Sequence, residues 1–148
     1  EIRAAVENHE PTASVITTVM ETFAWSLGFD RVLLLLFTPG KKQLVGRMLL
    51  GNVPDFNPKS FTRKVGQEAS AYAPDALAIK ESRPVYRGDP LFEDGWPFAT
   101  IPVGFDKRAI GVIYADRSSE SNEDLSSREQ AAVSVLAELL DRSISLNS

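Results

Sequence analysis

The sequence predicts an α+β fold in which two antiparallel β-hairpins are flanked by two long helices. Three observations predict it: apolar residues at helical spacing near both ends, two pairs of apolar runs joined by short polar turns, and a proline-rich stretch between the pairs. A chain of 148 residues with 43% hydrophobic residues suits a single domain, because about two-thirds of the unfolded surface can be buried at this size. We expect the domain to span residues 12–146, with residues 1–11 as a linker or a frayed helical lead-in.

The first helix is predicted from Thr12 onward. Pro11 suits a helix start, and Gly28 suits a C-cap. Between them, apolar residues recur with the spacing of one helical face: Val15, Ile16, Val19, Met20, Phe23, Ala24 and Leu27. This pattern predicts an amphipathic helix.

The first hairpin follows this helix. Val32–Phe37 are six consecutive apolar residues, which is typical of a strand covered on both faces. Residues 39–42 predict a turn, and Leu44–Leu50 predicts a more mixed returning strand. Gln43 and Arg47 indicate that this second strand lies at an edge of the sheet.

The middle of the chain differs in character. Gly51–Pro97 holds six of the nine prolines, so long regular elements are not expected there. We predict short helical turns around Pro58–Lys64 and Pro74–Glu81, followed by a short strand at Pro84–Arg87.

The second hairpin is the clearest strand signal. Ala99–Val103 and Ala109–Tyr114 are apolar runs on either side of the polar Asp106–Arg108. Both alternate sets of the second run are apolar or small, which predicts a central strand covered on both faces. One set has little side-chain bulk and leaves room for a helix to approach: Ala109, Gly111 and Ala115.

The last helix is predicted to begin at a capping box. Ser126 suits the N-cap, and Glu129 stands at the third helical position, where its side chain can return a hydrogen bond. The apolar face then continues along the chain: Ala132, Val133, Leu136, Leu139, Leu140 and Ile144.

Charge and composition exclude several classes of protein. A net charge of −4 and a pI near 5.0 argue against a general partner of nucleic acid or anionic membranes, because both need a basic face. No apolar run approaches the length of a spanning helix. The absence of cysteine excludes disulfides, thiolate nucleophiles and cysteine-held metals, and is compatible with a cytoplasmic setting.

No pattern in the sequence indicates catalysis. His9 is the one histidine and stands in the polar leader without a nucleophile or metal partner nearby. Asp89, Glu93 and Asp94 are acidic, but nothing fixes them at a spacing suited to acid–base chemistry. A phosphate-binding glycine loop is also missing. We therefore expect no catalytic residue, no metal site and no cofactor.

The best candidate for a binding site is a group of aromatic and cationic side chains: Tyr86, Arg87, Phe92, Trp96 and Phe98. Such residues beside a sheet can form an apolar pocket with a few placed polar groups, suited to a small molecule. A loop without regular structure also needs aromatic side chains to anchor it to the sheet. Both interpretations remain open.

A second candidate surface surrounds Trp25. On a helical wheel Trp25 falls opposite the apolar arc of the first helix, on the same side as Glu21. Either it packs against the last helix, whose apolar arc includes Leu139, or it anchors a subunit interface, where tryptophan is enriched. We expect a homodimer through the terminal helices, with Trp25, Glu21 and Leu139 in the interface.

The order of helix, hairpin, irregular segment, hairpin and long helix resembles the GAF domain family. The stretch IGVIYADR (Ile110–Arg117) looks most like that family's signature, and ESRPVYRGD (Glu81–Asp89) resembles the stretch leading to its pocket-side strand. The resemblance runs from Thr12 to Ile144 and rests on four segments: Phe29–Gly51, Ala76–Asp89, Ile101–Arg117 and Leu125–Ile144.

This resemblance implies a five- or six-stranded antiparallel sheet. The N- and C-terminal helices would pack on one face, and the irregular segment would cover the other face over a possible ligand cavity. Family members sense small molecules such as cyclic nucleotides, bilins, haem or metabolites, and signal to attached domains through their terminal helices. Attachment of bilins, and the family's methionine sulfoxide reductases, require cysteine, which is missing here.

Two functions follow as expectations. The first is a non-catalytic sensor domain of a cytoplasmic signalling protein that binds a small molecule. The alternative is a structural module for dimerisation or protein docking with no small-molecule ligand.

Overall fold

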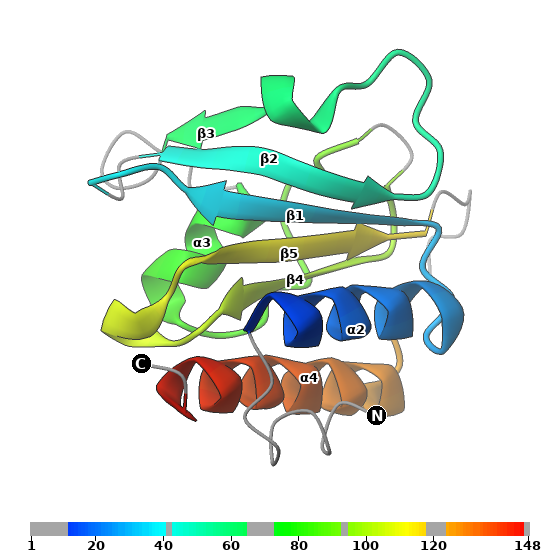
Figure 1. Ribbon diagram of the computed structural model, residues 1–148. Helices are drawn as coiled ribbons and strands as arrows, with labels where there is room; N and C mark the ends of the chain where they lie inside the picture. Colours follow the sequence, from blue (N-terminus) through cyan, green and yellow to red (C-terminus); the bar gives the residue numbers. More distant parts are fainter. Residues whose placement is uncertain (1–11, 41–42, 65–72, 93–94, 118–123, 147–148) are drawn as a thin grey trace.

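The computed structural model describes residues 12–40, 43–64, 73–92, 95–117 and 124–146 (Figure 1). Five strands in this part of the chain form one antiparallel sheet, in the order β3-β2-β1-β5-β4. They are β1 (Arg31–Phe37), β2 (Gln43–Leu50), β3 (Thr62–Lys64), β4 (Phe98–Val103) and β5 (Gly111–Asp116). The predicted α+β fold is confirmed. The lead-in expected at residues 1–11, with His9, lies outside the described residues.

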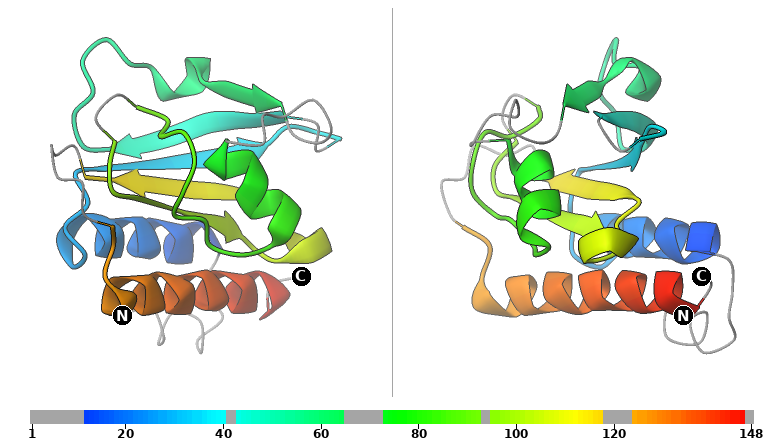
Figure 2. Two further views of the ribbon diagram at one scale, coloured as in Figure 1. Left: turned by 180° about the vertical axis from the view of Figure 1, so that it is seen from behind. Right: turned by 90° about the vertical axis from the view of Figure 1, so that its left-hand side faces the viewer.

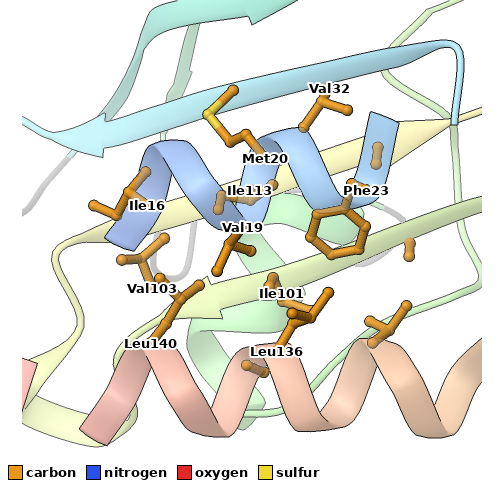
Figure 3. Packing of buried hydrophobic residues seen from close by; sticks show 14 of the residues in the cluster. Ile16, Val19, Met20, Phe23, Val32, Ile101, Val103, Ile113, Leu136 and Leu140 are labelled. Atoms are coloured by element: carbon orange, nitrogen blue, oxygen red, sulfur yellow. The ribbon is translucent and has the colours of Figure 1, made fainter. Parts of the chain in front are cut away.

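Two long helices lie side by side on one face of the sheet, as expected (Figures 1 and 2). They are α2 (Thr12–Trp25) and α4 (Ser127–Leu146). Their apolar stripes meet the sheet in a helix-side cluster, part of which is shown in Figure 3: Val19, Phe23, Ile101, Ile113, Leu136 and Leu140. Each such side chain stabilises the fold by about 1.5–3 kcal/mol when buried, so this layer fixes both helices to the sheet. Within the described ranges, no helix combines the length and apolar character needed to cross a membrane.

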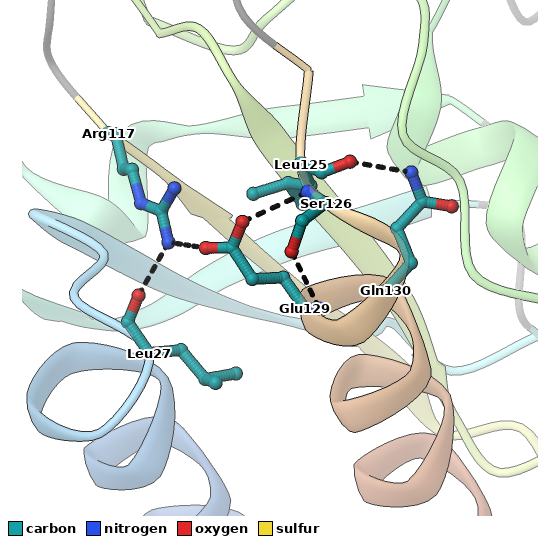
Figure 4. Close-up of polar contacts among 6 residues, drawn as sticks. All are labelled: Leu27, Arg117, Leu125, Ser126, Glu129 and Gln130. Atoms are coloured by element: carbon teal, nitrogen blue, oxygen red, sulfur yellow. Dashed lines mark hydrogen bonds and ion pairs between the residues drawn. The ribbon is translucent and has the colours of Figure 1, made fainter.

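Helix α4 begins at the predicted capping box (Figure 4). The Glu129 N–H donates to Ser126 Oγ at 3.1 Å, and the Ser126 N–H donates to Glu129 Oε1 at 2.9 Å. Arg117, just after β5, donates to the Glu129 carboxylate and to the carbonyl oxygen of Leu27, just after α2. The first turn of α4 is therefore fixed both to the sheet and to the end of α2.

The opposite face of the sheet is covered by α3 (Pro74–Glu81) and by residues 83–92 and 95–97, the covering segment (Figure 2). Helix α3 has the bounds that the sequence predicts. Beneath these segments lies a loop-side cluster of buried residues: Leu33, Leu35, Leu44, Phe98, Val112 and Tyr114. The sheet is therefore buried on both faces at its centre.

The strand expected at Pro84–Arg87 is reduced to a single bridge between Val85 and Thr100. Pro84 has no N–H to donate. Gly88 has a φ of 129°, which lies outside the range of a β-strand. Between Pro84 and Gly88, the pairing with β4 is therefore limited to one residue, Val85.

The expectation that β2 lies at the edge of the sheet is wrong. β3 pairs with β2 on its outer side, with Leu44 opposite Arg63. Of the helical turn predicted at Pro58–Lys64, only Pro58–Ser60 is helical, as the 3-10 turn η1. A three-residue strand shows too little alternation to be recognised in a sequence, and its pairing with β2 decides its conformation.

β5 is an interior strand, as predicted, with β1 on one side and β4 on the other. Ile113 and Ala115 belong to the helix-side cluster, and Tyr114 belongs to the loop-side cluster. The sequence suggested that Gly111 leaves room for a helix to approach β5, but the structure gives a different reason for a glycine here. A Cβ at this position would lie 2.1 Å from the carbonyl oxygen of Leu35 on β1, so the neighbouring strand requires the glycine.

Candidate functional site

Four of the five residues expected to bind a ligand line one hollow beside the start of α4: Tyr86, Arg87, Trp96 and Phe98. The remaining lining residues are Pro97, Asp124, Leu125 and Gln130. The hollow has a volume of about 30 Å³, which is room for about two water molecules. It lies between the segment that covers the sheet and the first turns of α4.

Tyr86 is positioned by the bridge that precedes it. Val85 and Thr100 exchange two backbone hydrogen bonds of 2.8 and 2.9 Å, which fix this segment along β4. The Tyr86 ring packs against the helix-side cluster, and its hydroxyl donates to the carbonyl oxygen of Gln130 at 3.1 Å. Burial raises the pKa of Tyr86, against an opposing hydrogen bond with Ser134. The hydroxyl is therefore protonated at neutral pH and joins this segment to α4.

Arg87 and Asp124 form an ion pair at the mouth of the hollow. Nη2 of Arg87 lies 2.6 Å from Oδ2 of Asp124, and the two side chains are 77% and 47% exposed. Exposed pairs of this kind contribute about 0–1 kcal/mol, because water and salt screen them. A ligand with an anionic group can therefore replace Asp124 on Arg87 at little cost.

The aromatic wall of the hollow continues into the loop-side cluster. The rings of Trp96 and Phe98 meet edge to face with centroids 5.5 Å apart, and Phe98 lies 5.7 Å from the ring of Tyr114. Phe92, the fifth expected residue, does not line this hollow. Its ring packs 5.0 Å from that of Phe56 and 6.0 Å from that of Tyr114. Phe92 therefore anchors the covering segment to the sheet.

A buried polar network lies next to Phe92, and sequence reasoning missed it. Arg31 on β1 donates to both carboxylate oxygens of Asp116 on β5, at 2.7 and 3.1 Å. The Tyr114 hydroxyl donates to Asp116 Oδ2 at 2.6 Å and accepts the Leu91 N–H at 3.2 Å. The guanidinium of Arg31 also lies 4.8 Å from the centre of the Phe92 ring. The network joins β1, β5 and the covering segment.

The buried position of Asp116 shifts the pKa values of this network. The Asp116 side chain is fully buried, and this desolvation raises its pKa although hydrogen bonds from Arg31 and Tyr114 oppose the shift. Burial and the nearby Asp116 charge raise the pKa of Tyr114 as well. The available sequence signal was a basic residue at the start of one apolar strand, Arg31, and an acidic residue at the end of another, Asp116. These two charges can be recognised as an ion pair only once it is known that β1 and β5 are neighbouring strands.

A second buried carboxyl group lies at the start of α3. Asp75 is fully buried and accepts a 3.0 Å hydrogen bond from Arg63 Nε, which ties β3 to α3. Within the part of the chain that the structure describes, Oδ1 of Asp75 has no hydrogen-bond partner. Burial raises the pKa of Asp75, and the charge and hydrogen bond of Arg63 oppose this.

The other acidic candidates form no recognisable centre. Asp89 is exposed, while Glu93 and Asp94 lie outside the described residues. Among the residues whose positions are described, no group of three or more His, Asp or Glu side chains could hold a metal ion.

Trp25 lies at the end of α2 with 76% of its surface exposed, so it does not pack against α4 within the chain. Glu21 and Leu139 are half-buried. Val135 on α4 is a second large apolar side chain on the helical layer, at 52% exposure. Among the residues described in α2 and α4, Trp25 and Val135 are therefore the large apolar side chains presented to solvent.

The sequence matches no protein-family model and no curated protein. Solved structures do resemble the fold. The GAF-B domain of DevS from Mycobacterium smegmatis has a TM-score of 0.70 at 20% identity, over 92% of this chain and 94% of that one. For the GAF domain of a two-component sensor histidine kinase from Bacillus halodurans, the TM-score is 0.64 at 19% identity, over 90% and 92%.

Free methionine-R-sulfoxide reductase from Neisseria meningitidis, in complex with its substrate, has a TM-score of 0.72 at 14% identity, over 99% of this chain and 85% of that one. At these identities, the similarity concerns the path of the backbone and not the chemistry of a site. The TM-scores show that the path of the backbone agrees with these neighbours over most of the chain. The chain therefore has the fold of GAF domains.

Proposed function

We propose that this chain is a non-catalytic regulatory domain of a cytoplasmic signalling protein, which binds a small molecule at the hollow beside Tyr86. One observation carries the proposal: the walls of the hollow come from both the covering segment and the start of α4. A molecule bound between Trp96 and Gln130 would contact the helix directly. The structural neighbour from a sensor histidine kinase supports a role in signalling.

The size of the hollow limits the ligand. At about 30 Å³ it is much smaller than common ligand pockets, which occupy ~300–1,000 Å³. A molecule larger than two waters must displace the half-buried Trp96 or separate Arg87 from Asp124. Arginine binds carboxylate and phosphate groups through paired hydrogen bonds, so an anionic metabolite is the class that this site favours.

The absence of cysteine supports a non-catalytic role. The resemblance to the GAF family implies that the family's methionine sulfoxide reductases use cysteine, which this sequence lacks. In the described part of the chain, the buried acids Asp75 and Asp116 are each paired with an arginine. Both side chains are fully buried and so are not exposed to a substrate.

Native mass spectrometry of the purified chain tests the proposal, because a co-purified small molecule would appear as added mass. The molecule that is found should stabilise the chain by about 2.7 kcal/mol at 100 times its dissociation constant. Arg87→Ala should weaken this stabilisation. Arg83→Ala is the matched control, since Arg83 is an exposed arginine that pairs with Glu81 and does not line the hollow. If no added mass is seen and no anionic metabolite from a panel stabilises the chain, the proposal of ligand binding is contradicted.

A dimerisation or docking module without a ligand is the second candidate. The observation that favours it is the exposure of Trp25 and Val135 on the terminal helices. Tryptophan is enriched among the residues that dominate interface energies, and a large exposed aromatic ring is costly to leave in water. In the first proposal the functional surface is the hollow, which binds a ligand. In the second it is the exposed face of α2 and α4, which binds another protein chain.

A further inference from the structure

The turn between β4 and β5, residues 104–109, lies at the edge of the sheet between helices of opposite faces (Figure 1). Two consecutive backbone N–H groups of this turn donate in opposite directions. The Asp106 N–H donates to Oγ of Ser82, the C-cap residue of α3, at 3.0 Å. The Phe105 N–H donates to Oδ1 of Asp141 on α4 at 2.8 Å. Two successive peptide units thus connect the loop-side face to the helix-side face.

Asp141 holds this turn at a second point. Arg108 donates to both carboxylate oxygens of Asp141, from Nε at 3.0 Å and from Nη2 at 2.7 Å. Burial alone would raise the pKa of Asp141, but the hydrogen bonds from Arg108 and Phe105 outweigh it and leave the pKa below its ordinary value. The carboxylate is therefore ionised at neutral pH and accepts three hydrogen bonds from the turn.

The backbone of the turn has little freedom to absorb a displacement. Gly104 has a φ of 95°, and a Cβ there would lie 2.9 Å from Cδ1 of Ile144 on α4. Ser82 and Asp106 both have left-handed backbones, with φ of 51° and 55°. Non-glycine residues keep such conformations only where their surroundings hold them. A movement of Ser82 is therefore passed to the turn.

We propose that the β4–β5 turn couples the position of α3 to the C-terminal half of α4. A shift of α3 on the loop-side face moves Ser82, Ser82 moves the turn through Asp106, and the turn moves α4 through Asp141. This route does not depend on the hollow, which contacts α4 at Gln130. Asp141 lies about 16 Å further along the helix, at a rise of about 1.5 Å per residue.

Amide hydrogen exchange of the whole chain, resolved by NMR, tests the coupling. Ser82→Gly removes the acceptor hydroxyl and suits the left-handed backbone. It should speed exchange in α4 at residues 140–145 by roughly two- to tenfold, the range that corresponds to one lost hydrogen bond. Ser82→Asn offers a side-chain acceptor on a residue that tolerates this backbone, and should stay close to wild type. The amides of α2 report any global loss of stability.

Ser60→Gly is the matched control, because the Ser60 hydroxyl donates to Asn57 in the turn η1, away from both helices. It should leave exchange in α4 unchanged. If Ser82→Gly speeds exchange only within α3 and the turn, with α4 at its wild-type rate, the proposed coupling is wrong.

The reverse experiment starts from the other end of the route. Coupling between two sites is reciprocal in free energy. Arg108→Gln removes an arginine that is 48% exposed, so the fold should be retained. Exchange at the amides of Ser82 and Arg83 should become faster in this variant while the α2 amides stay unchanged. Wild-type exchange at both amides would overturn the proposal even if Ser82→Gly proves too unstable to study.

Discussion

The buried hydroxyl of Tyr114 offers a direct test of the network at the end of the sheet. Tyr114→Phe removes one oxygen and keeps the ring, including its contacts with Phe92 and Phe98. The change deletes the hydrogen bond donated to Asp116 at 2.6 Å and the one accepted from the Leu91 N–H at 3.2 Å. Asp116 is fully buried, so water cannot replace the lost donor without opening the structure.

The magnitude follows from these two bonds. A hydrogen bond to a charged group contributes about 1.5–3 kcal/mol, and one between neutral groups about 0.5–1.5 kcal/mol. We therefore expect Tyr114→Phe to lower the free energy of unfolding by about 2–4.5 kcal/mol. At roughly 3 °C per kcal/mol for a chain of this length, the melting temperature should fall by about 6–14 °C.

The loss should also depend on pH. The hydrogen bond from Tyr114 opposes the rise in the pKa of Asp116, so the variant should hold an Asp116 with a still higher pKa in the folded state. When the pKa of Asp116 is higher in the folded state than in the unfolded state, the folded protein loses stability as the pH rises from the unfolded-state pKa through the folded-state pKa. The variant should therefore approach wild type in acid, where Asp116 is protonated in both proteins, and differ most at neutral pH.

Urea unfolding followed by circular dichroism measures these differences. Tyr86→Phe is the matched control, because the half-buried Tyr86 donates one hydrogen bond to a carbonyl oxygen and none to a carboxylate. It should cost about 1 kcal/mol or less. Equal losses for the two variants, or a Tyr114→Phe loss that does not change with pH, would refute the assignment of a buried charged hydrogen bond.

Three further predictions concern other parts of the fold. Gly111→Leu should cost at least ~1–3 kcal/mol by overpacking, because its Cβ would meet the Leu35 carbonyl oxygen; an unchanged melting temperature would contradict the pairing of β1 with β5. Trp25→Glu should convert a dimer into a folded monomer in sedimentation velocity, and a wild-type chain that stays monomeric at high concentration would exclude the dimer. Hydrogen bonds from Arg117 and from Ser126 in the capping box lower the pKa of Glu129. The stability that Glu129 contributes is therefore complete above its unfolded-state pKa, and it is lost as the pH falls through the lower folded-state pKa. Thermal melts of Glu129→Ala should show a loss of about 1 kcal/mol at neutral pH and a smaller loss in acid.

The candidate site was predictable only in part. Tyr86, Arg87, Trp96 and Phe98 are close in sequence, so a rule based on aromatic and cationic composition could group them. Gln130 comes from α4 and closes the same hollow, but no local pattern connects it with Tyr86. The contact between Gln130 and Tyr86 depends on how α4 packs across the edge strand β4.

Local patterns in the sequence were enough to predict the order and type of the main elements. The spacing of apolar residues predicted α2 and α4, the reciprocal capping of Ser126 and Glu129 predicted where α4 begins, and Pro74–Glu81 was recognised with the bounds of α3. These features depend on hydrogen bonds and side-chain contacts within a few residues, so the local sequence contains the relevant information.

The tertiary structure alone decided the strand order and the buried polar pairs. The short strand β3 exists because β2 offers it a partner, since three residues are too few to form a strand in isolation. Arg31 and Asp116 stand 85 positions apart and become a pair only when β1 and β5 are neighbours in one register. Such contacts follow from packing over long separations, where apolar burial fixes the arrangement and the polar groups must then find partners within it.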